Sequence, residues 1–212
     1  MAGTTPKGAP TFANTDVANF AVDLSAVSVW ASGKIGESAA AAGSLPSPSV
    51  WAGRTITALD TGAIYASNGS SWKCIFSPLT SYTPTFTNLT VGTGGTTVAS
   101  WSRSGALVSW RVLVTLGSAG FSVNDVSVSL PVACASTGAA TNVTLLGDVT
   151  YIDVSAGSSG RHRGAAALGA SITTARLLSG TAPMGGVVAA VPFTWAAGDQ
   201  ISINGTYLTD VN

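Results

Sequence analysis

The 212-residue chain has very little charge. It holds nine Lys and Arg residues and nine Asp and Glu residues, so the formal net charge is zero and charged residues make up 8% of the chain, against about 25% in an average soluble protein. No basic excess is present to neutralise phosphates, so we expect no nucleic-acid partner. A surface with so little electrostatic repulsion favours association with copies of the chain or with other proteins.

Residues that bind metals or transfer protons are equally scarce. The two cysteines, Cys74 and Cys134, have neither disulfide-framework nor metal-ligand spacing, so we interpret both as small buried hydrophobes. The single histidine stands between two arginines, and the nine carboxylates are scattered, with Asp148 and Asp153 the closest pair at strand spacing. We therefore expect no catalytic residues, no metal and no cofactor, and hence no enzyme. A two-carboxylate glycan hydrolase remains an alternative, because distant carboxylates can meet in space.

Long apolar runs are absent as well. No stretch of about 18 apolar residues occurs, so we expect no membrane insertion. The first eight residues contain no apolar segment, and we expect no secretory signal.

The N-terminal segment contains a candidate self-association helix. Residues 1–14 hold two prolines and are interpreted as an extended arm, after which Thr15 or Asp16 can cap a helix. Apolar residues then recur at the spacing of a coiled-coil seam: Val17, Phe20, Leu24, Val27 and Ala31. One interpretation is a single helix packed on its own domain, and the other is a helix bundled with its copies. Two heptads are marginal alone in water, so the helix needs a partner. We predict a homotrimer with Val17, Phe20, Leu24 and Val27 at its interface.

A linker and a hairpin are expected next. Residues 38–50 are rich in Ala, Ser and Pro and are typical of a linker. Residues 62–67 and 70–76 flank Asn68-Gly69, a strong hairpin signal. A two-residue turn at that dipeptide predicts that Tyr65 lies directly opposite Trp72.

From residue 82 onward the pattern is that of β-structure. Apolar residues alternate with polar ones through residues 106–116, where Val108, Trp110, Val112, Val114 and Leu116 share one face. Further alternating sets are Val126, Val128, Leu130, Val132; Val143, Leu145, Val149, Tyr151; Val191, Phe193, Trp195; and Ile201, Ile203, Tyr207. Short strands at roughly ten-residue spacing predict an antiparallel β-sandwich or barrel.

A candidate ligand-binding cluster lies between two of these strands. In a strand, Arg161 and Arg163 share one face and His162 points to the other. The segment is interpreted as a polar edge strand, or else as a site for an anionic ligand together with Asp153. Contact with a partner would fall on loops 153–163 and 117–125, because a rigid sandwich presents its loops outward.

Five segments resemble a domain common in minor tail proteins of phages that infect actinobacteria. They are residues 81–92 (Ser-Tyr-Thr-Pro-Thr-Phe-Thr-Asn-Leu-Thr-Val-Gly), 107–112, 128–132, 191–199 and 205–207. The hairpin at residues 63–72 is similar to those that precede such domains in phage fibres. The resemblance implies a virion protein assembled in the host cytoplasm, with a β-sandwich or jelly-roll-like tip, a homotrimeric state and no catalytic residues.

These observations together predict a mainly β protein in three parts. They are an arm and short helix that anchor and trimerise the chain (1–45), a linker and β-hairpin (46–80), and a jelly-roll-like antiparallel β-sandwich tip (81–212). The expected function is a trimeric tail fibre or knob that binds other virion proteins and contacts host cell-wall glycan. Alternatives are a head fibre or decoration protein on the capsid surface, a glycan depolymerase, and a cellular adhesin.

Overall fold

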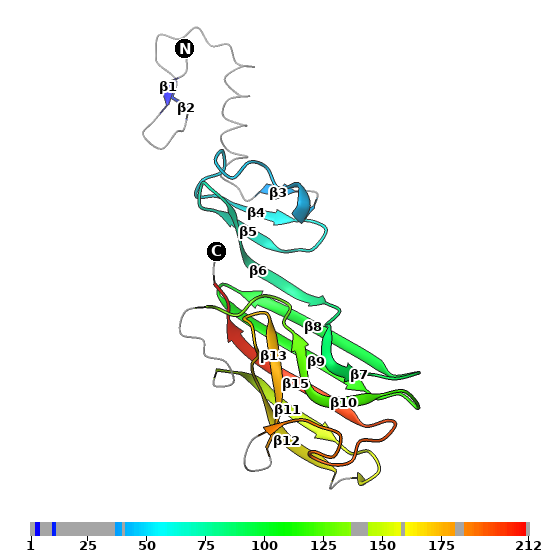
Figure 1. Ribbon diagram of the computed structural model, residues 1–212. Helices are drawn as coiled ribbons and strands as arrows, with labels where there is room; N and C mark the ends of the chain where they lie inside the picture. The colour runs from blue at the N-terminus through cyan, green and yellow to red at the C-terminus, as the bar shows by residue number, and fades with distance from the viewer. Residues whose placement is uncertain are drawn as a thin grey trace. The chain divides into compact units, whose positions relative to one another are not determined.

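The chain forms two compact units, residues 1–75 and 76–212. This computed structural model describes residues 41–136, 144–157, 160–180 and 185–210, together with the backbone of three short strands nearer the N-terminus. Figure 1 labels the strands in chain order. The predicted helix, with Val17, Phe20, Leu24 and Val27, lies outside the described residues.

The first unit is built from short strands. β1 (Gly3–Thr4) pairs antiparallel with β2 (Pro10–Thr11), and β3 (Glu37–Ala39) pairs parallel with β4 (Thr55–Ala58). β4 pairs antiparallel with β5 (Ile64–Ser67), which neighbours β6 (Trp72–Ser81). A 3-10 turn spans Ala42–Ser44.

The segment expected to be a plain linker is partly ordered, and its proline carbonyls explain why. The Trp72 indole N–H donates to the Pro46 carbonyl at 2.7 Å, and the Ser67 hydroxyl donates to the Pro48 carbonyl at 2.7 Å. These bonds fasten residues 46–48 to the hairpin. Within the segment predicted as a linker, residues 38–39 belong to β3 and residues 42–44 form the 3-10 turn.

The hairpin forms where it was expected, but its turn is displaced by one residue. The Asn68 amide donates to the Ser71 carbonyl, which leaves Gly69 and Ser70 as the two central turn residues. Gly69 has a φ of 90°, which suits the first central position of a primed turn. Counted outward from that pair, Tyr65 lies opposite Cys74. The ring of Trp72 instead packs against the ring of Trp51, with 6.1 Å between their centroids. The predicted Tyr65–Trp72 pair is wrong.

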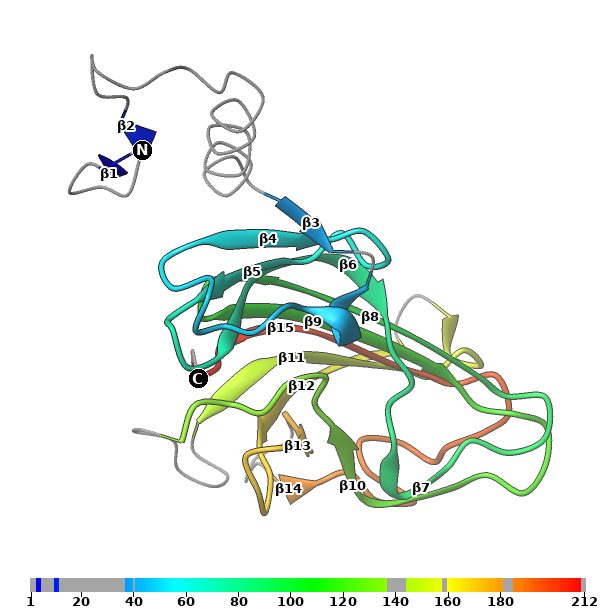
Figure 2. The same cartoon turned by 90° about the horizontal axis from the view of Figure 1, so that it is seen from above.

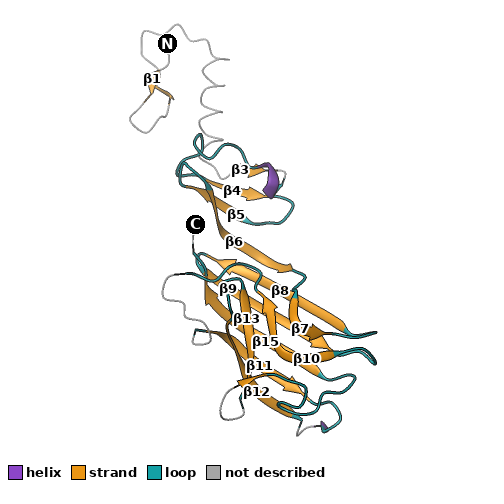
Figure 3. Cartoon of the chain, in the orientation of Figure 1, coloured by secondary structure: helices purple, strands orange, loops and turns teal. Residues whose placement is uncertain are grey.

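The second unit is a curved antiparallel sheet whose two halves enclose a core (Figure 2). The strand order β8-β9-β15-β11 makes one layer and β12-β13-β10-β7 makes the other, without closing into a barrel. Their bounds are β7 (Phe86–Thr90), β8 (Thr96–Ser104), β9 (Leu107–Thr115), β10 (Ser122–Ser129), β11 (Leu145–Ile152), β12 (Arg161–Leu168), β13 (Thr174–Ser179) and β15 (Gln200–Leu208). β14 (Gly185–Gly186) pairs with β13. The predicted mainly β, sandwich-like fold is confirmed (Figure 3).

The alternating patterns account for the core of this unit. All five residues predicted to share a face are buried, four in β9 and Leu116 directly after it, and so are the three in β15. β9 and β15 pair along their whole length, from Gln200 opposite Thr115 to Leu208 opposite Leu107. Trp110 and Trp195 are buried as expected. Cys134 is buried too, whereas Cys74 is only half-buried, so the interpretation of both cysteines as core residues is half correct.

Two predicted strand patterns differ from the structure. A bulge between Leu145 and Gly147 turns Leu145 outward, with 62% of it exposed, and buries Leu146 in its place. Residues 191–195 form a loop that joins no named strand, and only Val191 makes an isolated bridge. Pro192 lacks the N–H that a central strand must donate, which explains the second difference.

Two tyrosines in the core provide a matched stability test. The Tyr82 hydroxyl is buried and has no hydrogen-bond partner among the described residues, whereas the Tyr207 hydroxyl donates to the Val132 carbonyl at 2.6 Å. Tyr82→Phe is expected to raise the free energy of unfolding by about 1 kcal/mol, because it removes a polar atom with no bond to lose. Tyr207→Phe is expected to lower it by about 1 kcal/mol. Denaturant unfolding followed by circular dichroism measures both, and equal losses in the two variants would contradict the assignment.

The tyrosines also predict a loss of stability in alkali. Burial raises the pKa of all four: Tyr65, Tyr82, Tyr151 and Tyr207. Their stabilising contribution is complete below a pH of about 10, where unfolded tyrosine ionises, and it is lost as the pH rises through the higher native pKa values. Phenolate absorbance of the native protein should therefore rise at higher pH than that of the denatured chain, together with the loss of β-structure. Superimposable curves would contradict this.

Candidate binding site at one end of the sandwich

The structure places the predicted ligand-binding residues around the connection between β11 and β12. Asp153 follows the last residue of β11, and Arg161, His162 and Arg163 begin β12. Both arginines are exposed, while His162 is half-buried on the opposite face. The predicted division of this strand into two faces is confirmed. β12 lies between β11 and β13, so the prediction of an edge strand is wrong.

Asp153 shapes the loop rather than offering its carboxylate outward. Its Oδ1 accepts hydrogen bonds from the Ser155 hydroxyl at 2.6 Å and from the Ala156 amide at 3.2 Å. The Ser155 hydroxyl is the main cause that lowers the pKa of Asp153, and the nearby His162 adds to it. The carboxylate is therefore an anion across the neutral pH range, with its Oδ1 already used inside the turn.

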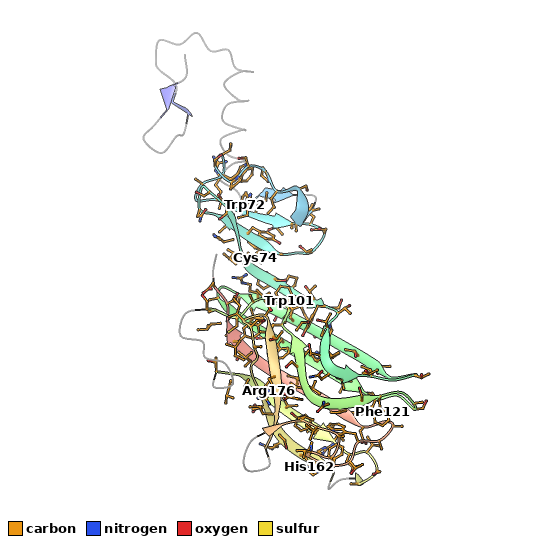
Figure 4. The ribbon with its side chains drawn as sticks, viewed as in Figure 1. Trp72, Cys74, Trp101, Phe121, His162 and Arg176 are labelled. Atoms are coloured by element: carbon orange, nitrogen blue, oxygen red, sulfur yellow. The ribbon has the colours of Figure 1, made fainter. Side chains whose placement is uncertain are left out.

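His162, labelled in Figure 4, begins a series of aromatic rings that leads into the core. Its ring lies 5.1 Å from Phe193, which lies 4.5 Å from Trp195, which in turn meets Tyr151 edge-on at 5.9 Å. The indole of Trp195 donates to the Val188 carbonyl, and the hydroxyl of Tyr151 donates to the Leu178 carbonyl. These two hydrogen bonds hold Trp195 and Tyr151 in the core, and Phe193 and His162 continue the series outward from them.

The contact between Phe193 and His162 was not predicted from the sequence. The alternating pattern predicted that Phe193 and Trp195 share one face of a strand, whereas residues 191–195 form a loop that brings Phe193 against His162. The proline at position 192 was the available signal, because a proline within an apolar run argues against a central strand.

A buried carboxylate ties together the loops around this site. Asp199 is 1% exposed, and its two oxygens accept hydrogen bonds from the amides of Val154 at 3.0 Å and Ala196 at 2.7 Å. The first amide belongs to the loop after β11 and the second to the segment before β15. Asp199 therefore couples the loop that carries Asp153 to the segment that follows Trp195.

The two exposed arginines at this end of β12 can recognise an anion. Neither Arg161 nor Arg163 forms an ion pair with any described residue, and exposed guanidinium groups bind carboxylates and phosphates. Across the part of the chain that the structure describes, no three His, Cys, Asp or Glu residues gather as a metal site would require. Asp148, the predicted partner of Asp153, lies on the outer face of β11, paired with Asn204.

The second loop expected to contact a partner starts at the same end of the sheet, because Thr115 pairs with Gln200, which pairs with Ile152. In loop 117–125, Gly117 donates its amide to Val91, and Ser118 donates to Thr93, so this loop interlocks with residues 91–95.

No helix among the described residues is long and apolar enough to cross a membrane. Comparison of the chain with protein-family models, with curated proteins and with solved structures finds no match to any of them.

Proposed function

We propose that this chain is a structural protein of a phage virion, a trimeric tail fibre or knob whose β-sandwich contacts the host cell surface. The observation that carries the proposal is the position of the segments that resemble minor tail proteins. Residues 81–92 include β7, residues 107–112 lie in β9, and residues 205–207 lie in β15. Three of the five similar segments therefore include strands that build the core of the second unit.

The surface chemistry supports the same function. A chain with 8% charged residues and a net charge of zero favours stable contacts with other copies and with other virion proteins. The exposed arginines Arg161 and Arg163, which pair with Ile152 and Thr150 of β11, provide positive charge for an acidic cell-wall glycan. Val17, Phe20, Leu24 and Val27 are the proposed trimer contacts.

Antibody labelling of whole phage particles tests the virion assignment. An antibody raised against the full chain should label one end of the tail. Label on the head would support the head-fibre or decoration alternative, and particles without label would overturn the proposal. The same antibody absorbed with purified protein is the control.

Light scattering of the purified chain should give the mass of a trimer, and a monomeric mass at micromolar concentration would contradict the trimer.

A further inference from the structure

The outer face of the sheet formed by β8, β9 and β15 carries a groove. Its volume is about 280 Å³, close to the lower end for small-molecule sites. Val98, Arg111, Leu113, Ser202 and Asn204 line it with outward-facing side chains, and Val112 and Ile203 complete its floor. Strand pairing places Leu113 opposite both Val98 and Ser202, and Arg111 opposite Asn204.

The groove contains an oriented cation with no counter-ion. The Arg111 Nε donates to the Ser100 hydroxyl at 2.8 Å, and Ser100 is buried. This bond holds the guanidinium by one edge and leaves its terminal N–H groups for another acceptor. Arg111 forms no ion pair with any described residue. An anionic group is therefore the ligand feature that this position recognises.

The remaining lining residues specify more than an anion. The Asn204 amide and the Ser202 hydroxyl, which lie within 3.4 Å of each other, donate and accept hydrogen bonds. Val98 and Leu113 are 58% and 39% exposed and offer an apolar surface beside them. Asp148 is paired with Asn204 on the side away from Arg111. It does not line the groove, and its negative charge disfavours a compact dianion such as phosphate there.

We infer that this groove binds a sugar carrying a carboxylate, such as a uronic acid. The carboxylate pairs with Arg111, ring hydroxyls bond Asn204 and Ser202, and the apolar face of the ring covers Val98 and Leu113. The inference rests on the proposed function, because a host cell-wall glycan is the expected source of such a sugar.

Titration of the full chain with glucuronate, followed by the amide resonances in NMR spectra, tests the inference. Shifts are expected at residues 98, 111–113 and 202–204. Glucose, which lacks the carboxylate, should bind at least about tenfold more weakly, because a charge-assisted hydrogen bond is lost. Equal affinity for glucose, shifts confined to other residues, or stronger binding of inorganic phosphate would overturn the inference.

Two matched variants separate the groove from general surface charge. Arg111→Gln should weaken glucuronate binding at least about tenfold. Lys73→Gln removes a positive charge from β6, outside the groove, and should leave binding unchanged. Equal losses in both variants would contradict the assignment. Ser100→Ala keeps the charge but frees the guanidinium, and should give an intermediate loss in a chain that still folds. If glucuronate does not bind in this groove, the antibody labelling of particles is unaffected. The sugar-binding inference and the virion assignment can therefore fail separately.

Discussion

Replacing Gly205 with alanine should lower the free energy of unfolding of the second unit by about 3 kcal/mol. A Cβ at this position would meet the Leu146 carbonyl oxygen and the Gly147 backbone on the neighbouring strand. Trp110 lies opposite Gly205 in the sheet, and its indole N–H donates to that same Leu146 carbonyl at 3.0 Å. A methyl group here must therefore displace backbone in the middle of the sheet and disturb a buried hydrogen bond.

Denaturant unfolding of the full chain, followed by circular dichroism, measures this loss. Gly43→Ala is the matched control, because a Cβ there meets no atom within 4 Å, and its effect should stay within about 0.5 kcal/mol. A Gly205→Ala variant as stable as the unmodified chain would show that β11 and β15 can separate at this point without cost.

Asp199→Ala should lower the free energy of unfolding by about 2 kcal/mol and loosen the end of the sandwich that carries His162. The substitution leaves the amides of Val154 and Ala196 without their acceptor. Because these amides belong to two different segments, their loops lose the link between them. Asp199→Asn keeps the shape but places an N–H₂ group against one of the two amides, and should be nearly as harmful.

Hydrogen exchange gives the local measurement for this prediction. Exchange of the Val154 and Ala196 amides should accelerate in Asp199→Ala far more than exchange in β9. Asp210→Ala is the control, since Asp210 also accepts from a backbone amide and a hydroxyl, both of Ser136, but at the surface. Its cost should stay below about 1 kcal/mol. Uniform acceleration across the whole unit would instead indicate global destabilisation.

The candidate site was only partly predictable from the sequence. The faces of β12 follow from alternation, which places Arg161 and Arg163 outward and His162 inward. The contact between His162 and Phe193 joins residues 31 positions apart and depends on the path of a loop, which no local pattern encodes. The groove at Arg111 requires the pairing of β8, β9 and β15, and β15 lies about 90 residues further along the chain than β9.

The sequence by itself determined the class of fold and most of the core. A strand has a strict period of two, so the alternation in residues 106–116 and 201–207 was enough to identify which side chains are buried. Only the tertiary structure decided the bulge that exchanges Leu145 for Leu146, because it depends on pairing with β12, and a local pattern carries no information about a distant partner strand. The loop at Pro192 and the turn at Gly69 instead depend on local features, the missing N–H of Pro192 and the hydrogen bond between Asn68 and Ser71.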